Sequence, residues 1–157
     1  MAFPEDLLEQ SRHLATRERG RPRQASLRRA VSTAYYALFH LLIADAVGHW
    51  RIPAQRARLA RAFEHARMRS ASRQIAGSPF TDRDQAAVTH LRNVARAFDD
   101  LYEYRQTADY NNSIEWTRVE VLETVHIAEQ AFASWTAVRG TTIANDYLLS
   151  LFVKERS

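Results

Sequence analysis

AVSTAYYALFHLLIA, residues 30–44, is apolar on almost every side of a helix. A helix of this kind lies at the centre of a bundle or is covered by a second subunit. The stretch is shorter than the roughly 20 residues that cross a bilayer, and His40 and Asp45 interrupt it, so no membrane span or membrane partner is expected. It predicts a central buried helix, over Arg23–Val47.

The composition of the 157-residue chain favours helices on both sides of this stretch. Only 4 glycines and 4 prolines are present, and this scarcity of turn signals argues against a β-sandwich or β-barrel. The absence of cysteine excludes a disulfide framework, a thiolate metal site and a cysteine nucleophile. No basic region precedes an apolar run at the N-terminus, so we expect no signal peptide and a cytoplasmic protein.

Apolar residues at helical spacing and capping residues predict the remaining helices. Thr81 and Ser113 are the expected N-caps of two of them. The expected ranges are Pro4–Thr16, Pro53–Ile75, Asp82–Gln106 or beyond, Ile114–Val138 and Ile143–Val153. The sequence therefore predicts an all-α, up-and-down helical bundle of four long helices with shorter flanking helices. We expect a single domain over residues 1–157, with a short C-terminal helix within 141–157.

Arginine supplies almost all of the positive charge. The chain has a net charge of +4, and 21 of its 22 basic residues are arginines. Guanidinium groups bind phosphate bidentately, so an arginine-rich surface suits phosphate or RNA, whereas coding bias in a GC-rich genome produces the same composition. The basic segment Arg12–Arg29 is accordingly either a track for a phosphate backbone or a solvated linker.

The patterns that hold metals or nucleotide cofactors are missing from the sequence. No two of the six histidines are three or four residues apart, and no glycine-rich phosphate loop or His-Glu-x-x-His pattern occurs. We therefore expect no metal site and no cofactor.

Two separated motifs resemble a known family. The first is LRRAVSTAYYALFH at residues 27–40, and the second is RQTADYN at residues 105–111. Together they resemble the HEPN domains, especially a bacterial group with an Arg-Arg-Ala-x-Ser-x-Ala-Tyr-Tyr-Ala-x-Phe-His signature and an Arg-x-x-Ala-Asp-Tyr element near the end of a long helix. The resemblance covers about residues 27–135.

This resemblance implies a helical bundle, commonly a homodimer, that acts on RNA or binds it. Many HEPN proteins are metal-independent endoribonucleases in toxin–antitoxin, defence or RNA-processing systems, and many bacterial ones are partnered with a small nucleotidyltransferase. Two functions remain open. One is RNA cleavage without a metal, and the other is a non-catalytic interaction module that binds a nucleotide or a nucleotidyltransferase partner.

The HEPN catalytic signature is an arginine followed, after four to six residues, by a histidine. The histidine moves a proton near neutral pH, and the arginine stabilises the charge on the phosphate. After Arg105 the histidine position holds Tyr110, a poor general base at pH 7 because an ordinary tyrosine pKa is about 10. The alternative role for Arg105 is an i,i+4 ion pair with Asp109.

The arginine-to-histidine spacing occurs twice more, from Arg58 to His65 and from Arg83 to His90, and chance alone explains such matches in an arginine-rich chain. In the expected third helix, Arg58, Arg61 and His65 lie on one face at positions i, i+3 and i+7. We predict these three as the catalytic candidates, the alternative being a solvated basic face.

Residues of the two motifs are the candidates for binding. Phosphate or RNA binding is predicted for Arg28, Arg29, Arg105, Asp109 and Tyr110. The aromatic side chains of residues 35–40 could stack on bases, although an aromatic stripe on an apolar helix is more often core or dimer interface.

Overall fold

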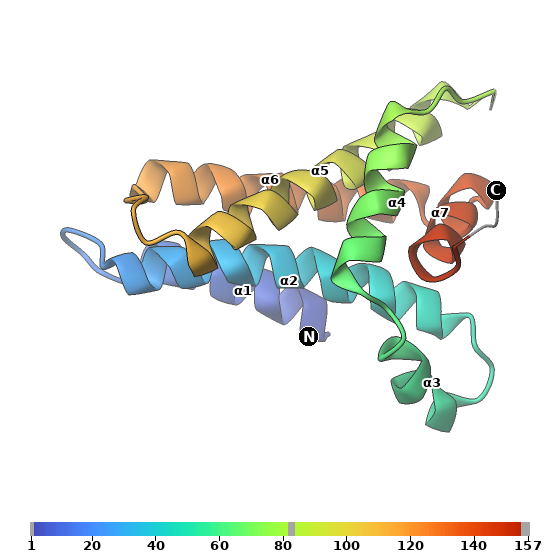
Figure 1. The fold of residues 1–157 in the computed structure, drawn as a ribbon, viewed down its shortest axis with the longest axis horizontal. Helices are drawn as coiled ribbons and strands as arrows, with labels where there is room; N and C mark the ends of the chain where they lie inside the picture. Colours follow the sequence, from blue (N-terminus) through green and yellow to red (C-terminus); the bar gives the residue numbers. More distant parts are fainter. Residues whose placement is uncertain (1, 82–83, 155–157) are drawn as a thin grey trace.

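The computed structural model describes residues 2–81 and 84–154, and this part of the chain contains seven helices and no strand (Figure 1). The predicted all-α class is therefore confirmed. The helices are α1 (Phe3–Ala15), α2 (Gln24–Gly48), α3 (Pro53–Ala60), α4 (His65–Gly77), α5 (Gln85–Tyr110), α6 (Arg118–Val138) and α7 (Thr142–Phe152).

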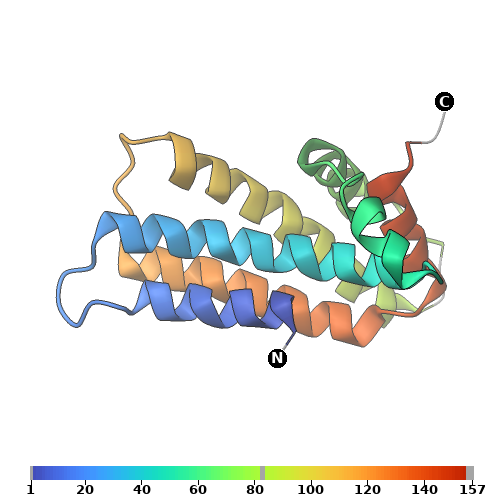
Figure 2. The same ribbon diagram turned by 90° about the horizontal axis from the view of Figure 1, so that it is seen from below.

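Four helices, α1, α2, α5 and α6, form an up-and-down bundle in which consecutive members run in opposite directions (Figures 1 and 2). The helix α1 takes the place expected for residues 53–75 and, with 13 residues, is as short as α4. The central helix is α2, which packs against α1, α5 and α6. One end of the bundle is covered by α4 and α7, and α3 projects beside them (Figure 1).

The central position of α2 follows from its apolar circumference. Tyr35, Leu38 and Leu42 are fully buried, as are Ala30 and Val31 nearer its start. By length and composition alone this helix could cross a membrane. In this fold its neighbours bury most of it, so it is the core helix of a bundle.

The expected helix over residues 53–75 is wrong, because the chain forms two helices there. The first, α3, ends at Ala60, and α4 begins at His65. The break allows Phe63 to become buried and to pack on Phe152 of α7, with ring centres 5.3 Å apart. No glycine or proline marks this break, so long-range packing overrides local helix propensity.

Two expected N-caps are also wrong. Ser113 is held in a turn, where its backbone N–H and its hydroxyl both donate to Asn111 Oδ1. The next helix, α6, instead begins after Thr117, whose hydroxyl accepts from the Glu120 N–H as an N-cap and donates to the Glu120 carboxylate.

The N-cap of α5 is Asp84, which accepts from the Ala87 N–H, rather than Thr81. A carboxylate there also suits the positive end of the helix dipole. The predicted helix start at Asp82 lies outside the described residues.

Candidate functional site

Arg105 of α5 is buried against the central helix, with 7% of its surface exposed. Its guanidinium carbon lies 4.9 Å from the ring centre of Tyr35, 5.7 Å from that of Tyr36 and 5.5 Å from that of Tyr102. Cation–π attraction to three rings strengthens as water is excluded. The aromatic residues of the first motif therefore position the arginine of the second.

The polar contacts of the Arg105 guanidinium are incomplete. Its Nη1 donates to the Tyr36 hydroxyl over 3.4 Å and lies 3.9 Å from Asp109 Oδ2, which also accepts from the Ser32 hydroxyl. Within the described residues, its Nε is buried without a hydrogen-bond partner. The i,i+4 pair with Asp109 is thus present but long, and a guanidinium with five N–H donors keeps capacity for an oxyanion.

His65 contacts the same tyrosine pair. The break after α3 places it at the first position of α4, where its Nδ1 lies 2.7 Å from the Tyr35 hydroxyl. Its ring stacks on Phe39 at 4.2 Å between centres and meets the Tyr36 ring edge-on at 5.8 Å. Residues of α2, α4 and α5 therefore converge on one site, which we call the Tyr35–Tyr36 site.

The environment keeps His65 neutral near pH 7. Burial lowers its pKa below the ordinary value, and the charges of Arg105 and His40 lower it further. Burial raises the pKa of Tyr35, so this hydroxyl stays protonated. When Nδ1–H donates to the Tyr35 hydroxyl, Nε2 carries a lone pair and is a base. In the opposite tautomer, Nε2 carries the proton.

His40 is a second imidazole beside this site. From the sequence it was predicted only as one of the aromatic side chains of residues 35–40. Its ring stacks on Tyr36, one helical turn earlier on α2, with centres 6.3 Å apart. Burial lowers its pKa as well. The i,i+4 spacing of Tyr36 and His40 is a signal that could have indicated this neighbourhood.

Arg58 and Arg61 do not share a helix face with His65, so the predicted i, i+3, i+7 arrangement is wrong. Arg58 is exposed on α3, and Arg61 is exposed just after that helix ends. In the second spaced pair, Arg83 lies outside the described residues, and His90 Nδ1 lies 3.2 Å from the Ser134 hydroxyl.

Arg28 and Arg29 differ sharply in their surroundings. Arg28 Nη1 donates to the carbonyl oxygens of Ala108 and Asn111 at 2.9 and 3.0 Å, and its Nη2 donates to that of Ile114. Through these hydrogen bonds Arg28 holds the end of α5 and the following turn against α2. Arg29 is exposed, as is Tyr110, which has 72% of its surface accessible.

We predict that Arg28→Ala lowers the free energy of unfolding by about 1–3 kcal/mol, because it removes charge-assisted hydrogen bonds to three carbonyls. Arg29→Ala is the matched control and should change stability by no more than about 0.5 kcal/mol. Urea unfolding followed by circular dichroism measures both. Equal effects of the two substitutions would contradict a structural role for Arg28.

We also predict that acidification from about pH 7 to about pH 5 destabilises the protein through His65. Because the folded state lowers this pKa, the unfolded chain binds more protons below its ordinary value near 6.5, and stability falls as the pH drops through that window. Urea unfolding at both pH values should show a smaller loss for His65→Asn than for wild type. The control is His126→Asn, which replaces an exposed histidine. If His65→Asn loses as much stability on acidification as wild type and this control do, His65 is not the cause of the pH dependence.

In comparisons with known proteins, no family model, curated protein or solved structure matches the chain. Among the described residues, no group of three or more His, Asp or Glu side chains is placed to hold a metal ion. The Tyr35–Tyr36 site brings together a neutral imidazole, a buried guanidinium and tyrosine hydroxyls.

Proposed function

We propose that the protein is a HEPN-type bundle that binds single-stranded RNA and cleaves it without a metal ion. One observation carries this proposal: His65 and Arg105, from different helices, contact the same pair of tyrosines. A base and an anion-stabilising cation beside the same two tyrosines are the two groups that phosphodiester cleavage by side chains requires.

The roles in this reaction follow from the contacts. Arg105 binds a non-bridging oxygen of the phosphate. The Tyr36 hydroxyl accepts from Arg105, so its own hydrogen remains available to the same phosphate. His65 Nε2 takes the proton of the ribose 2′-hydroxyl, and the 2′-oxygen then bonds to phosphorus. The bond from phosphorus to the 5′-oxygen breaks, and that oxygen takes a proton from water, leaving a 2′,3′-cyclic phosphate and a 5′-hydroxyl.

In this scheme His65 replaces the histidine that the Arg-x-x-Ala-Asp-Tyr element lacks. Tyr110 occupies that motif position and is largely exposed. The base is instead supplied from α4, with the pKa of its imidazole held below the ordinary value. A neutral imidazole at pH 7 is the form that can accept a proton.

The second candidate is a non-catalytic module that binds a nucleotide or a nucleotidyltransferase partner. The observation in its favour is the enclosure of Arg105, whose side chain is only 8% exposed and faces the Asp109 carboxylate. A phosphate must reach this guanidinium past that carboxylate. An arginine so enclosed can also serve solely to join α5 to α2.

Incubation with mixed-sequence single-stranded RNA in EDTA separates the two functions. We expect cleavage by wild type, and cleavage at least about 10²-fold slower by a folded His65→Asn variant. Binding of RNA without cleavage would favour the interaction module. A folded protein that neither binds nor cleaves RNA would overturn RNA as the ligand.

A further inference from the structure

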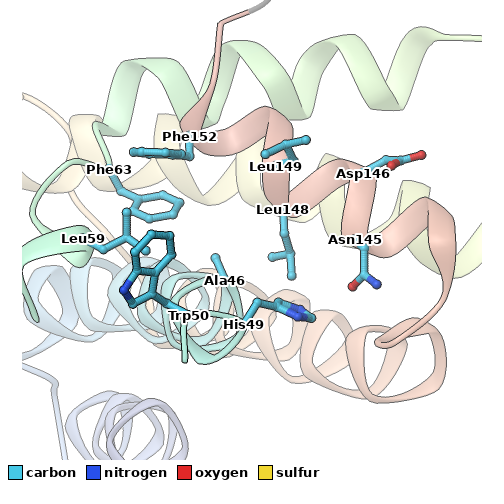
Figure 3. Close-up of a pocket in the computed structure, with 10 residues that line it drawn as sticks. All are labelled: Ala46, His49, Trp50, Leu59, Phe63, Asn145, Asp146, Leu148, Leu149 and Phe152. Carbon is cyan, nitrogen blue, oxygen red and sulfur yellow. The ribbon is translucent and has the colours of Figure 1, made fainter. Parts of the chain in front are cut away.

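A cavity lies apart from the Tyr35–Tyr36 site, between the end of α2, α3 and α7 (Figure 3). Its volume is about 440 Å³, within the usual range of small-molecule sites. Trp50, Leu59, Phe63 and Phe152 gather at one side of it, and Asn145 and Asp146 lie at the other (Figure 3). We call it the α3–α7 pocket.

The aromatic side of this pocket is held in place although it is partly exposed. Trp50 has 48% of its surface accessible, yet its indole Nε1 donates to Gln55 Oε1 over 2.8 Å. Arg56 Nε donates to the Trp50 carbonyl oxygen over 2.9 Å. Phe63 is fixed against Phe152. A partly exposed aromatic ring held in this way offers a planar surface on which a base can stack.

The polar side chains of the pocket lie away from its aromatic side. In Figure 3 the Asp146 carboxylate and the Asn145 amide are both directed away from the aromatic rings. A base on the aromatic side is therefore held by stacking on a ring rather than by hydrogen bonds to these groups.

The position and charge of the pocket connect it to the proposed RNA site. Phe63 lines the pocket and His65 follows two residues later, so their Cα atoms are at most about 7.6 Å apart. Arg51, Arg58 and Arg61 are exposed around α3, and the sequence from 47 to 63 contains no acidic residue. A phosphate backbone that leaves His65 would therefore meet positive charge beside the pocket.

We propose that the α3–α7 pocket binds a base of the RNA, one nucleotide or two from the phosphate that is cleaved. This inference rests on the proposed function and names where a neighbouring nucleotide binds. Trp50 stacks on the base, and Arg58 and Arg61 contact the backbone rather than the reacting atoms.

The test uses short 2′-O-methyl oligonucleotides, which lack the attacking hydroxyl and so cannot be cleaved. Oligo(A) and oligo(C) should quench the fluorescence of Trp50, because the other two tryptophans are buried. Trp50→Ala should weaken binding of these oligomers about tenfold. Tyr104→Ala, which removes a partly exposed aromatic residue of α5, is the matched control and should leave affinity unchanged.

The outcomes distinguish this inference from the proposed function. If wild type cleaves RNA through His65 but Trp50→Ala binds the oligomers like wild type, the pocket inference alone is overturned. If Trp50→Ala instead changes only the oligomeric state in light scattering, the pocket is a contact between copies of the chain, and the inference is again overturned. If wild type neither binds nor cleaves RNA, both proposals fail.

Discussion

Replacing His65 with asparagine lowers the rate of RNA cleavage by about 10²–10⁴-fold, the usual contribution of a general base. The amide of asparagine reaches the position of the imidazole Nδ1 and can keep the hydrogen bond to the Tyr35 hydroxyl. It has no counterpart of Nε2 that can accept a proton. The substitution therefore removes the chemistry while retaining the contact that joins α4 to α2.

The matched control for this prediction is His126→Asn, which replaces an exposed histidine of α6. Cleavage rates are measured in EDTA at pH 7, with circular dichroism to confirm that each variant is folded. The control should cleave at the wild-type rate. A folded His65→Asn variant that cleaves within threefold of wild type would remove His65 from the reaction.

Replacing Arg105 with lysine lowers the cleavage rate by about 10²–10³-fold, as expected when a group that stabilises transition-state charge is lost. Lysine keeps the positive charge beside the rings of Tyr35 and Tyr102. It lacks the planar fork that can contact the Tyr36 hydroxyl and a phosphate oxygen at the same time. We therefore expect a much larger effect on cleavage than on folding.

Arg96→Lys is the control for this second prediction, because Arg96 is an exposed arginine on the same helix. Single-turnover rates with saturating RNA, compared with dissociation constants for uncleavable 2′-O-methyl RNA, separate binding from chemistry. Arg105→Lys should lose more in rate than in affinity. Equal, small losses for both variants would assign Arg105 a structural role only.

The helices of the bundle could be predicted because the spacing of apolar residues within each helix indicates it. The apolar circumference of residues 30–44 indicated a central helix, and the apolar spacing along α5 and α6 indicated their buried faces. The Thr-x-x-Glu pattern of Thr117 and Glu120 is a sequence signature of a helix N-terminus, so this N-cap could also have been predicted in place of Ser113. The break between α3 and α4 could not be predicted from the sequence, because contacts with distant residues of α2 and α7 determine it.

The site could be predicted only in part for the same reason. The motif indicated Arg105, and the pair with Asp109 follows from i,i+4 spacing. His65 was predicted with the wrong neighbours, because its actual partner, Tyr35, is 30 residues away in the sequence. Helical spacing reports only which residues of one helix share a face. It carries no information about which helices meet.

The ends of the RNA products show whether His65 and Arg105 form one metal-independent cleavage site. Wild-type protein is incubated with a defined single-stranded RNA in EDTA, and the fragments are analysed by mass spectrometry. We expect 2′,3′-cyclic phosphate and 5′-hydroxyl ends, at least about 10²-fold less abundant with His65→Asn and with Arg105→Lys. Intact RNA with folded wild-type protein, or fragments that both variants produce as fast as wild type, would rule out such a site.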